Sequence, residues 1–281
     1  MVDLHLHTNY SDGQYPPAQV VFLAAAAGVS LLAVTDHDTV AGLETSARAA
    51  AEHGIGFIPG IEISTDAHRD MHMLGYYIDA ENTPLRDFCA LMAQQRRERE
   101  GRIYGFLAQR GIVLTPEQVN RYIEHELVGR PHFARAMVAA GYVATTQEAF
   151  DKHLATPAFA ALERPKPTPE ESIALIARAG GAAVLAHPGL LAYSDEALQN
   201  LICRLIPAGL KGLECHYSLH TPAQTAFYTA LARKYHLLIT GGSDFHGEAV
   251  KPDIRIGYGT GDTPLFADSG IADRLYAAAH A

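Results

Sequence analysis

Histidine and acidic residues stand in pairs at the ends of short apolar runs in this sequence. His5 and His7 are two residues apart in VDLHLH, and Asp244 and His246 repeat the spacing in SDFH. Side chains two residues apart on a β-strand point to the same side, as two ligands of one metal ion must. Imidazole together with carboxylate suits zinc, manganese or iron. Both segments are therefore candidate metal-binding sequences.

Residues of the same types lie at the ends of most other predicted strands. A lone histidine at a strand end is usually an ordinary loop residue, so no single position carries the argument. The set as a whole indicates a metal site, because the carboxyl ends of parallel barrel strands converge on one face. The further members are His37, Glu62, His72, His187 and the run Glu214-Cys215-His216.

Two stretches of the chain alternate between short apolar runs and Ala-rich helical segments, which is typical of parallel β/α units. The middle of the chain instead contains the charged amphipathic segment QQRREREGRIYGFLAQRG and no convincing strand. Shorter helices are predicted there around 116–126, 131–140 and 146–154. We therefore predict an α/β barrel in two parts, residues 1–78 and 166–281, interrupted by an all-helical insertion at 79–165.

Composition limits the protein class. The chain has 281 residues, a net charge of −9, three scattered cysteines and no tryptophan. The acidic balance argues against binding to duplex nucleic acid. No apolar run is long enough to span a bilayer, and the N-terminus lacks the features of a removed signal peptide. We expect a cytoplasmic protein with reduced thiols and no membrane partner.

Six segments resemble the polymerase and histidinol phosphatase (PHP) family of metal-dependent phosphoesterases. They occur in the family's order and cover both predicted barrel parts. The resemblance implies a distorted (β/α)7 barrel, and it is strongest to stand-alone bacterial members that act on nucleotide-like phosphates and carry a helical insertion in the same place. The segments are DLHLHTNYSDG, LLAVTDHDTVAG, GIEIS, MHMLGYYI, AVLAHPG and GGSDFHG.

The resemblance also implies a set of ligands for two or three divalent ions of manganese, iron or zinc. Asp12 stands where some relatives have histidine. Asp3, Asp36 and Asp38 are candidates to orient ligand histidines through the second ring nitrogen, and Asp38 fits a turn-forming or capping role equally well. The implied ligands are His5, His7, Glu62 and Asp244 for one ion, Glu62, His72 and His187 for a second, and Asp12, His37 and His246 for a third.

Such a cluster predicts hydrolysis of a phosphate monoester by a metal-bound hydroxide. The expected partner is a small nucleotide-like phosphate, such as a nucleoside 3′,5′-bisphosphate. Three alternatives remain open: an exonuclease acting on the 5′ ends of short oligonucleotides, an amidohydrolase-type reaction at the same metals, and a non-enzymatic nucleotide-binding or polymerase-associated module. The complete ligand set and the lack of a polymerase segment disfavour the last.

The predicted insertion holds a candidate second anion site. Gly129-Arg130-Pro131-His132 begins a short helix, and an arginine at a helix N-terminus suits phosphate. Proline in the first turn is equally typical of an ordinary surface helix. Similarity to bisphosphate-cleaving members favours a substrate-binding role for Arg130 and His132. No role is assigned to His216, Tyr217 or His220, and Ser243 and Cys215 are expected to be structural.

Overall fold

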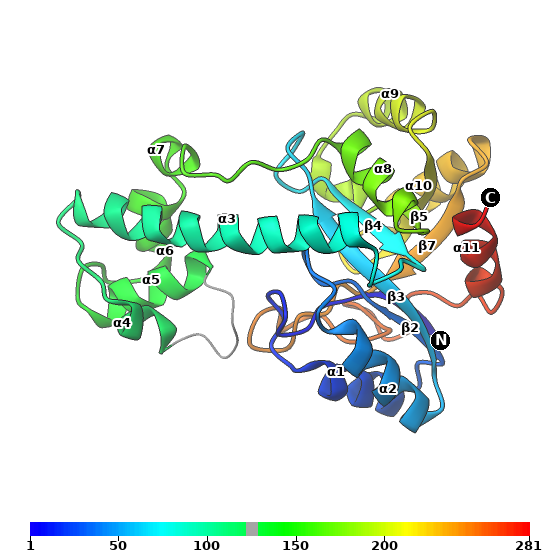
Figure 1. The fold of residues 1–281 in the computed structure, drawn as a ribbon, viewed down its shortest axis with the longest axis horizontal. Helices are drawn as coiled ribbons and strands as arrows, with labels where there is room; N and C mark the ends of the chain where they lie inside the picture. Colours follow the sequence, from blue (N-terminus) through cyan, green and yellow to red (C-terminus); the bar gives the residue numbers. More distant parts are fainter. Residues whose placement is uncertain (122–128) are drawn as a thin grey trace. The chain divides into compact units, whose positions relative to one another are not determined.

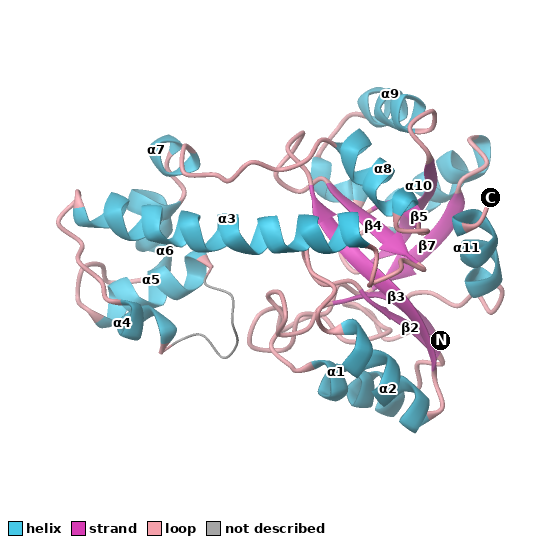
Figure 2. Ribbon diagram, viewed as in Figure 1, coloured by secondary structure: helices cyan, strands magenta, loops and turns pink. Residues whose placement is uncertain are grey.

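Seven strands form a nearly closed barrel in the computed structural model, which describes residues 1–121 and 129–281 (Figures 1 and 2). The strands pair in chain order, each with its neighbours in the sequence. The predicted distorted (β/α)7 barrel is therefore confirmed. The strands are β1 (Val2–Leu6), β2 (Leu31–Val34), β3 (Gly56–Ser64), β4 (His72–Tyr76), β5 (Ala182–Leu185), β6 (Leu210–Tyr217) and β7 (Leu238–Gly242).

Strand β4 runs against its neighbours, so the expectation of an entirely parallel sheet was wrong. It pairs antiparallel with both β3 and β5, while the remaining neighbours pair in parallel. Only the short segment 65–71 joins β3 to β4, whereas a parallel crossover needs a dozen residues or more. The reversal has a functional consequence: it is the first residue of β4, His72, that lies at the carboxyl end of β3.

Close backbone contact between β7 and β1 brings the two ends of the sheet together. The Asp244 N–H donates to the His5 carbonyl at 2.8 Å, and the His7 N–H donates to the Phe245 carbonyl at 3.1 Å. A Cβ atom at Gly242 would collide with the backbone of His5. Glycine is therefore required where the last strand approaches the first.

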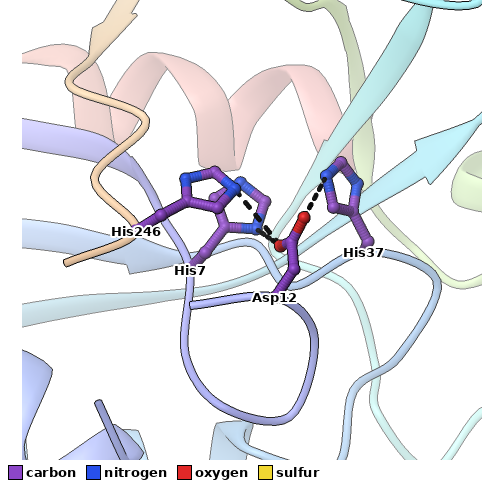
Figure 3. A group of neighbouring side chains, drawn as sticks. All are labelled: His7, Asp12, His37 and His246. Carbon is purple, nitrogen blue, oxygen red and sulfur yellow. Dashed lines mark ion pairs between the residues drawn. The ribbon is translucent and has the colours of Figure 1, made fainter. Parts of the chain in front are cut away.

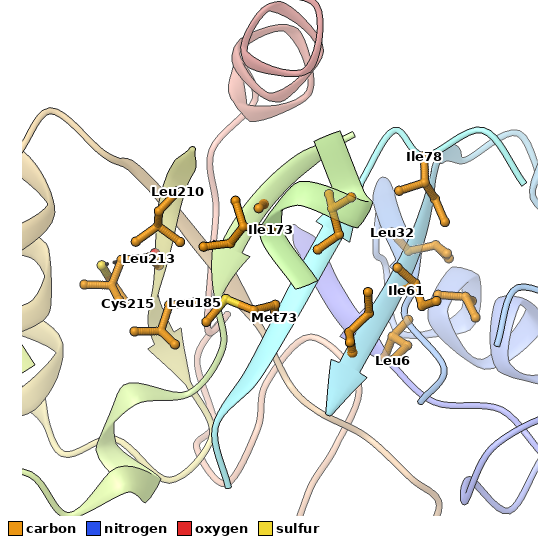
Figure 4. Packing of buried hydrophobic residues seen from close by; sticks show 14 of the residues in the cluster. Leu6, Leu32, Ile61, Met73, Ile78, Ile173, Leu185, Leu210, Leu213 and Cys215 are labelled. Carbon is orange, nitrogen blue, oxygen red and sulfur yellow. Dashed lines mark hydrogen bonds between the residues drawn. The ribbon is translucent and has the colours of Figure 1, made fainter. Parts of the chain in front are cut away.

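Alternation along the strands divides apolar side chains between two cores. On β5, Ala183 and Leu185 join the larger core between strands and helices, whereas Ala182 and Val184 join a second core. Figure 4 shows part of the larger core. On β3, Ile61 and Ile63 belong to that larger core, so Glu62 between them turns to the opposite side of the sheet.

Helices flank the strands of the barrel unit, which comprises residues 1–89 and 166–281. Helix α8 begins with a capping box, in which the Thr168 side chain accepts from the Glu171 N–H and the Glu171 side chain accepts from the Thr168 N–H. The helices are α1 (Pro17–Ala26), α2 (Leu43–His53), α8 (Pro169–Arg178), α9 (Asp195–Leu205), α10 (Pro222–Lys234), α11 (Ile271–Ala279) and the 3-10 turn η2 (Pro188–Leu191).

Residues 90–165 form a second compact unit, whose described part is helical around its own apolar core, including Phe133 and Phe159. Among the residues that the structure describes, no helix is long and apolar enough to cross a membrane. Positions 122–126 of the helix predicted at 116–126 lie outside the described residues. The helices are α3 (Thr83–Ala108), which begins in the barrel unit, α4 (Pro116–Asn120), α5 (Arg130–Ala139), α6 (Thr146–Ala149), the π-helix η1 (Phe150–Leu154) and α7 (Pro157–Ala160).

Candidate metal centre

The nine side chains predicted as metal ligands converge at one end of the barrel. His5 lies on β1, Glu62 on β3, and His72 begins β4. The others follow strands within a few residues: His7 and Asp12 follow β1, His37 follows β2, His187 follows β5, and Asp244 and His246 follow β7.

Glu62 lies at the centre of this cluster and contacts five of its histidines. Its carboxylate is buried, with 1% of the side chain exposed. Oxygen Oε2 lies 3.2 Å from His5 Nε2 and 3.1 Å from His37 Nδ1. Oxygen Oε1 lies 2.8 Å from His72 Nδ1 and 2.9 Å from His187 Nε2. The fifth neighbour is His7, whose Nε2 is 3.2 Å from Oε2.

Asp244 uses its two oxygens differently. Oδ1 faces His7 Nε2 at 3.2 Å and His5 Nε2 at 3.6 Å. Oδ2 accepts from the Tyr217 hydroxyl at 2.9 Å and from Lys251 Nζ at 2.6 Å. The backbone of Asp244 adopts a positive φ of 56°, which aspartate tolerates better than most residues. This arrangement leaves Oδ1 facing the histidines.

Asp12 lies among the rings of His7, His37 and His246 (Figure 3). Its carboxylate is 3.2 Å from His246 Nε2 and 3.8 Å from His37 Nε2. About half of its side chain, 52%, is exposed, whereas that of Glu62 is almost fully buried. This edge of the cluster is therefore open to solvent.

The donor set fits divalent metal ions. Four groups of three or four described side chains each place one potential ligand atom per residue within 4.8 Å of the others. The Nε2 atoms of His5 and His7 are buried and make no hydrogen bond. Such nitrogens suit zinc, manganese or iron. The groups are His7–Asp12–His37–His246, His5–His7–Asp244, His5–Glu62–His187 and His37–Glu62–His72, so the trio Glu62, His72 and His187 is divided between two groups.

Neighbouring carboxylates raise the pKa of the two buried histidines His5 and His7. Burial lowers the pKa of His7, but interaction with Asp244 and Glu62 outweighs it and raises the pKa to about 9. Burial likewise opposes protonation of His5, yet the charges of Glu214, Glu62 and Asp244 raise its pKa well above the ordinary value. Desolvation lowers the pKa of His37 to about 3. Without ions, these shifts favour the protonated forms of His5 and His7.

The structure gives the three neighbouring aspartates different roles: the predicted contact of Asp3 with a histidine ring is absent, whereas Asp38 fits its alternative capping role. Asp3 accepts from the backbone N–H of Ser243 at 2.8 Å and contacts no histidine ring. Asp38 accepts from the Ser64 N–H at 3.0 Å. Asp36 accepts from the Ser11 hydroxyl, whose oxygen is 3.3 Å from His7 Nδ1, and so reaches that ring only indirectly. A short aspartate side chain within a few residues of a strand end meets unpaired backbone N–H groups first.

Three further residues contact the cluster, of which Glu214 was expected at this face without a role, whereas no contact was predicted for Tyr217 or Lys251. Glu214 lies 2.9 Å from His5 Nδ1, while Tyr217 and Lys251 both donate to Asp244. Glu214 ends a predicted strand beside Cys215, which was a usable signal for its position. No sequence motif around Lys251 predicts its contact with Asp244, which lies seven residues earlier in the chain.

Arg130 and His132 lie in the second unit, where they begin helix α5. His132 Nδ1 accepts from the Gly129 N–H at 2.8 Å and thereby caps the helix. That bond places the ring proton on Nε2, because Nδ1 must hold a lone pair. His132 can therefore donate through Nε2. His216 packs its ring against Phe266, and His220 accepts from the Gly189 N–H.

Comparison with known proteins decides the family. The model of the PHP domain family matches residues 3–157, more than half of the chain. This chain belongs to the PHP family. Two relatives are similar along most of their length. The 5′-3′ exoribonuclease Rnm of Salmonella typhimurium is 34% identical over 87% of this chain and 84% of its own. The 3′,5′-nucleoside bisphosphate phosphatase of Chromobacterium violaceum is 33% identical over 87% of each chain.

Solved structures agree with this PHP assignment. An amidohydrolase from Chromobacterium violaceum, solved with bound sulfate and no metal, superposes with a TM-score of 0.81 and 31% identity over 97% of this chain and 96% of its own. A protein of Bifidobacterium adolescentis, provisionally named a metal-dependent phosphoesterase, has a TM-score of 0.78 and 30% identity over 99% of this chain and 96% of its own. The PHP protein described here is a metal-dependent phosphoesterase, a hydrolase that acts on ester bonds.

Proposed function

We propose that this enzyme removes a phosphate monoester from a small nucleotide-like substrate, with a nucleoside 3′,5′-bisphosphate as the best candidate. The convergence of nine imidazole and carboxylate side chains, with Glu62 in contact with five of the histidines, carries the proposal. One ion would be held by His5, His7, Glu62 and Asp244, a second by Glu62, His72 and His187, and a third by Asp12, His37 and His246.

Bound ions would supply Lewis-acid activation of water and of the phosphoryl group. The chain provides the charge balance that such a substrate needs. Asp12, Glu62 and Asp244 contribute three negative charges against six positive charges from three ions, so the site retains roughly +3. An excess of that size attracts a phosphate even though the protein carries a net charge of −9.

A phosphate-release screen of the manganese-loaded enzyme tests the substrate class. We expect the highest kcat/KM for nucleoside 3′,5′-bisphosphates, lower values for mononucleotides and sugar phosphates, and none for amides. Turnover of amides without phosphate release would reject the proposal and favour an amidohydrolase-type reaction.

Exonuclease activity is the second candidate, because the exoribonuclease and bisphosphatase relatives are similar to this chain to almost the same degree. Short 5′-phosphorylated RNA oligonucleotides separate the two. Stepwise release of mononucleotides with kcat/KM above that for the bisphosphate would favour the exonuclease. Release of inorganic phosphate from the bisphosphate alone would favour the phosphatase.

Replacing Asp12 with alanine is expected to remove about one metal ion per chain and leave the others. The reason is that Asp12 contacts His37, His246 and the second ring nitrogen of His7 at the exposed edge, and belongs to none of the groups of potential ligands that include Glu62. Elemental analysis after gel filtration measures the stoichiometry. Asp66→Ala, an exposed loop acid of the same unit, is the control and should keep every ion. Loss of all ions from Asp12→Ala would contradict the assignment.

We propose that Arg130 and His132 bind a phosphate other than the one that is cleaved. All proposed metal ligands lie on the barrel unit, whereas these two side chains lie on the second unit. Arg130 begins α5, where the helix N-terminus and the guanidinium both favour an anion. His132 adds an Nε2–H donor on the same turn.

The substitution Arg130→Met should lower kcat/KM for a nucleoside 3′,5′-bisphosphate by about ten- to a hundredfold, since losing a charge-assisted contact costs roughly 1.5–3 kcal/mol. A small aryl phosphate has no second phosphate and should be hydrolysed almost as before. The matched control is Arg135→Met, which removes an exposed arginine one turn further along α5. Equal losses of kcat/KM on both substrates would mean that Arg130 acts at the reacting phosphate or stabilises the fold. No loss on either substrate would mean that Arg130 is an ordinary surface residue.

A further inference from the structure

Glu214 on β6 is a buried acid that contacts two of the proposed ligands at once. Its side chain is fully buried. Oxygen Oε1 lies 2.9 Å from His5 Nδ1, and Oε2 accepts from the His187 backbone N–H at 2.7 Å. Strands β1 and β5, which carry or precede these histidines, are not neighbours in the sheet. One carboxylate therefore joins opposite parts of the metal centre.

The contact with His5 selects one form of that ring. A carboxylate only accepts hydrogen bonds, so the proton of neutral His5 lies on Nδ1. The lone pair is then on Nε2, the atom that is 3.2 Å from Glu62 and 3.6 Å from Asp244. Nε2 is also buried without a hydrogen bond of its own. The ring is thus oriented with its lone pair toward the other proposed ligands of the first ion.

The contact with His187 acts on the backbone instead. His187 has a φ of 24°, a conformation that residues other than glycine rarely adopt. Its N–H is bound by Glu214, and its ring Nε2 reaches Glu62 at 2.9 Å. The Glu214 carboxylate thereby holds the turn from which this ring projects.

We propose that Glu214 is a positioning residue of the metal centre, which selects the tautomer of His5 and fixes the turn of His187. The inference rests on the proposed roles of these histidines as metal ligands. Partners of this kind commonly tune metal affinity by ten- to a hundredfold. Glutamine at this position would keep one oxygen that accepts a hydrogen bond. Its NH2 group would face either the Nδ1–H of His5 or the backbone N–H of His187, and two donors cannot form a hydrogen bond with each other.

Asp3 provides a matched control. It is also fully buried beside His5, but its oxygens accept from the backbone N–H groups of Ser243 and Gly257 at 2.8 and 2.7 Å. Asp3→Asn therefore introduces the same change of acid to amide without touching a histidine ring. A general loss of packing at this end of the barrel should affect both variants.

The experiment is a Zn²⁺ titration of metal-free wild type, Glu214→Gln and Asp3→Asn. We expect Glu214→Gln to bind Zn²⁺ about ten- to a hundredfold more weakly, and Asp3→Asn to lose much less. Equal losses in the two variants, or none in Glu214→Gln, would overturn the role of Glu214. A wild type that binds no Zn²⁺ would overturn the proposed metal sites themselves and this inference with them.

Nuclear magnetic resonance of the Zn²⁺-loaded wild type tests the same point without any variant, so poor folding of Glu214→Gln cannot obscure the result. Long-range ¹H–¹⁵N correlation should show the His5 proton on Nδ1 and none on Nε2. A proton on Nε2 would overturn the inference.

Discussion

Replacing Glu62 with glutamine is expected to remove most of the bound metal and to lower phosphoesterase activity by on the order of a thousandfold or more. The reason is the position of Glu62 within 3.2 Å of five imidazole rings, which makes it a ligand common to two of the proposed sites. Glutamine has nearly the same shape but carries no charge, so the fold should change little.

Metal content and kcat/KM of the purified Glu62→Gln variant measure this effect, with circular dichroism as the check on folding. Glu44→Gln, an exposed acid on helix α2, is the matched control and should behave as wild type. A Glu62→Gln enzyme that retains its full metal content would contradict the central position of this carboxylate. Activity that survives complete removal of metal from the wild type would contradict the metal centre as a whole.

Metal binding to the metal-free enzyme at pH 7.5 is expected to release about two protons per chain. The pKa of His7 is raised to about 9 and that of His5 well above its ordinary value, so both rings are protonated at this pH. Each must lose a proton to become a ligand. His37 contributes none, because its pKa is lowered to about 3. Acidification from pH 8 to pH 7 should therefore weaken the apparent affinity for metal, because protons then compete for these rings.

Calorimetric titration with Mn²⁺ in two buffers of different ionisation enthalpy counts these protons. The variant His7→Gln should release about one proton fewer than wild type, because one raised pKa is gone. Metal content should fall steeply as the enzyme is acidified below about pH 6. Binding without proton release, or a metal content that is unchanged at pH 4.5, would contradict the charge states inferred for His5 and His7.

The same pKa shift predicts opposite effects of pH on the two forms of the protein. In the metal-free form, a raised pKa of His7 means that its ion pairs stabilise the fold fully below pH 6.5 and cease to do so as the pH rises through about 9. In the loaded form, the stabilisation contributed by metal is present at high pH and is lost on acidification. Thermal unfolding of both forms at pH 6 and pH 9.5 should show this difference.

The amino-acid sequence predicts the barrel, the helical insertion and the strand-end residues that could bind metal, and its resemblance to the PHP family implies the full set of nine ligands, Asp12 included. Its signals are local. The spacing of His5 and His7 places both side chains on one side of a strand, and polar residues that end apolar runs such as LLAV predict the face on which strands terminate. The antiparallel direction of β4 could also have been predicted from the sequence, because the seven residues of segment 65–71 are too few for a parallel crossover.

Contacts between distant segments were decided only by the tertiary structure. Glu214 and His5 are 209 residues apart, and their hydrogen bond exists because β6 and β1 belong to the same nearly closed barrel. Lys251 and Tyr217 reach Asp244 from two different segments in the same way. Strand periodicity specifies the side of the sheet to which a residue points, but not which residue lies opposite it. That pairing depends on the register and closure of the whole barrel, to which every strand contributes.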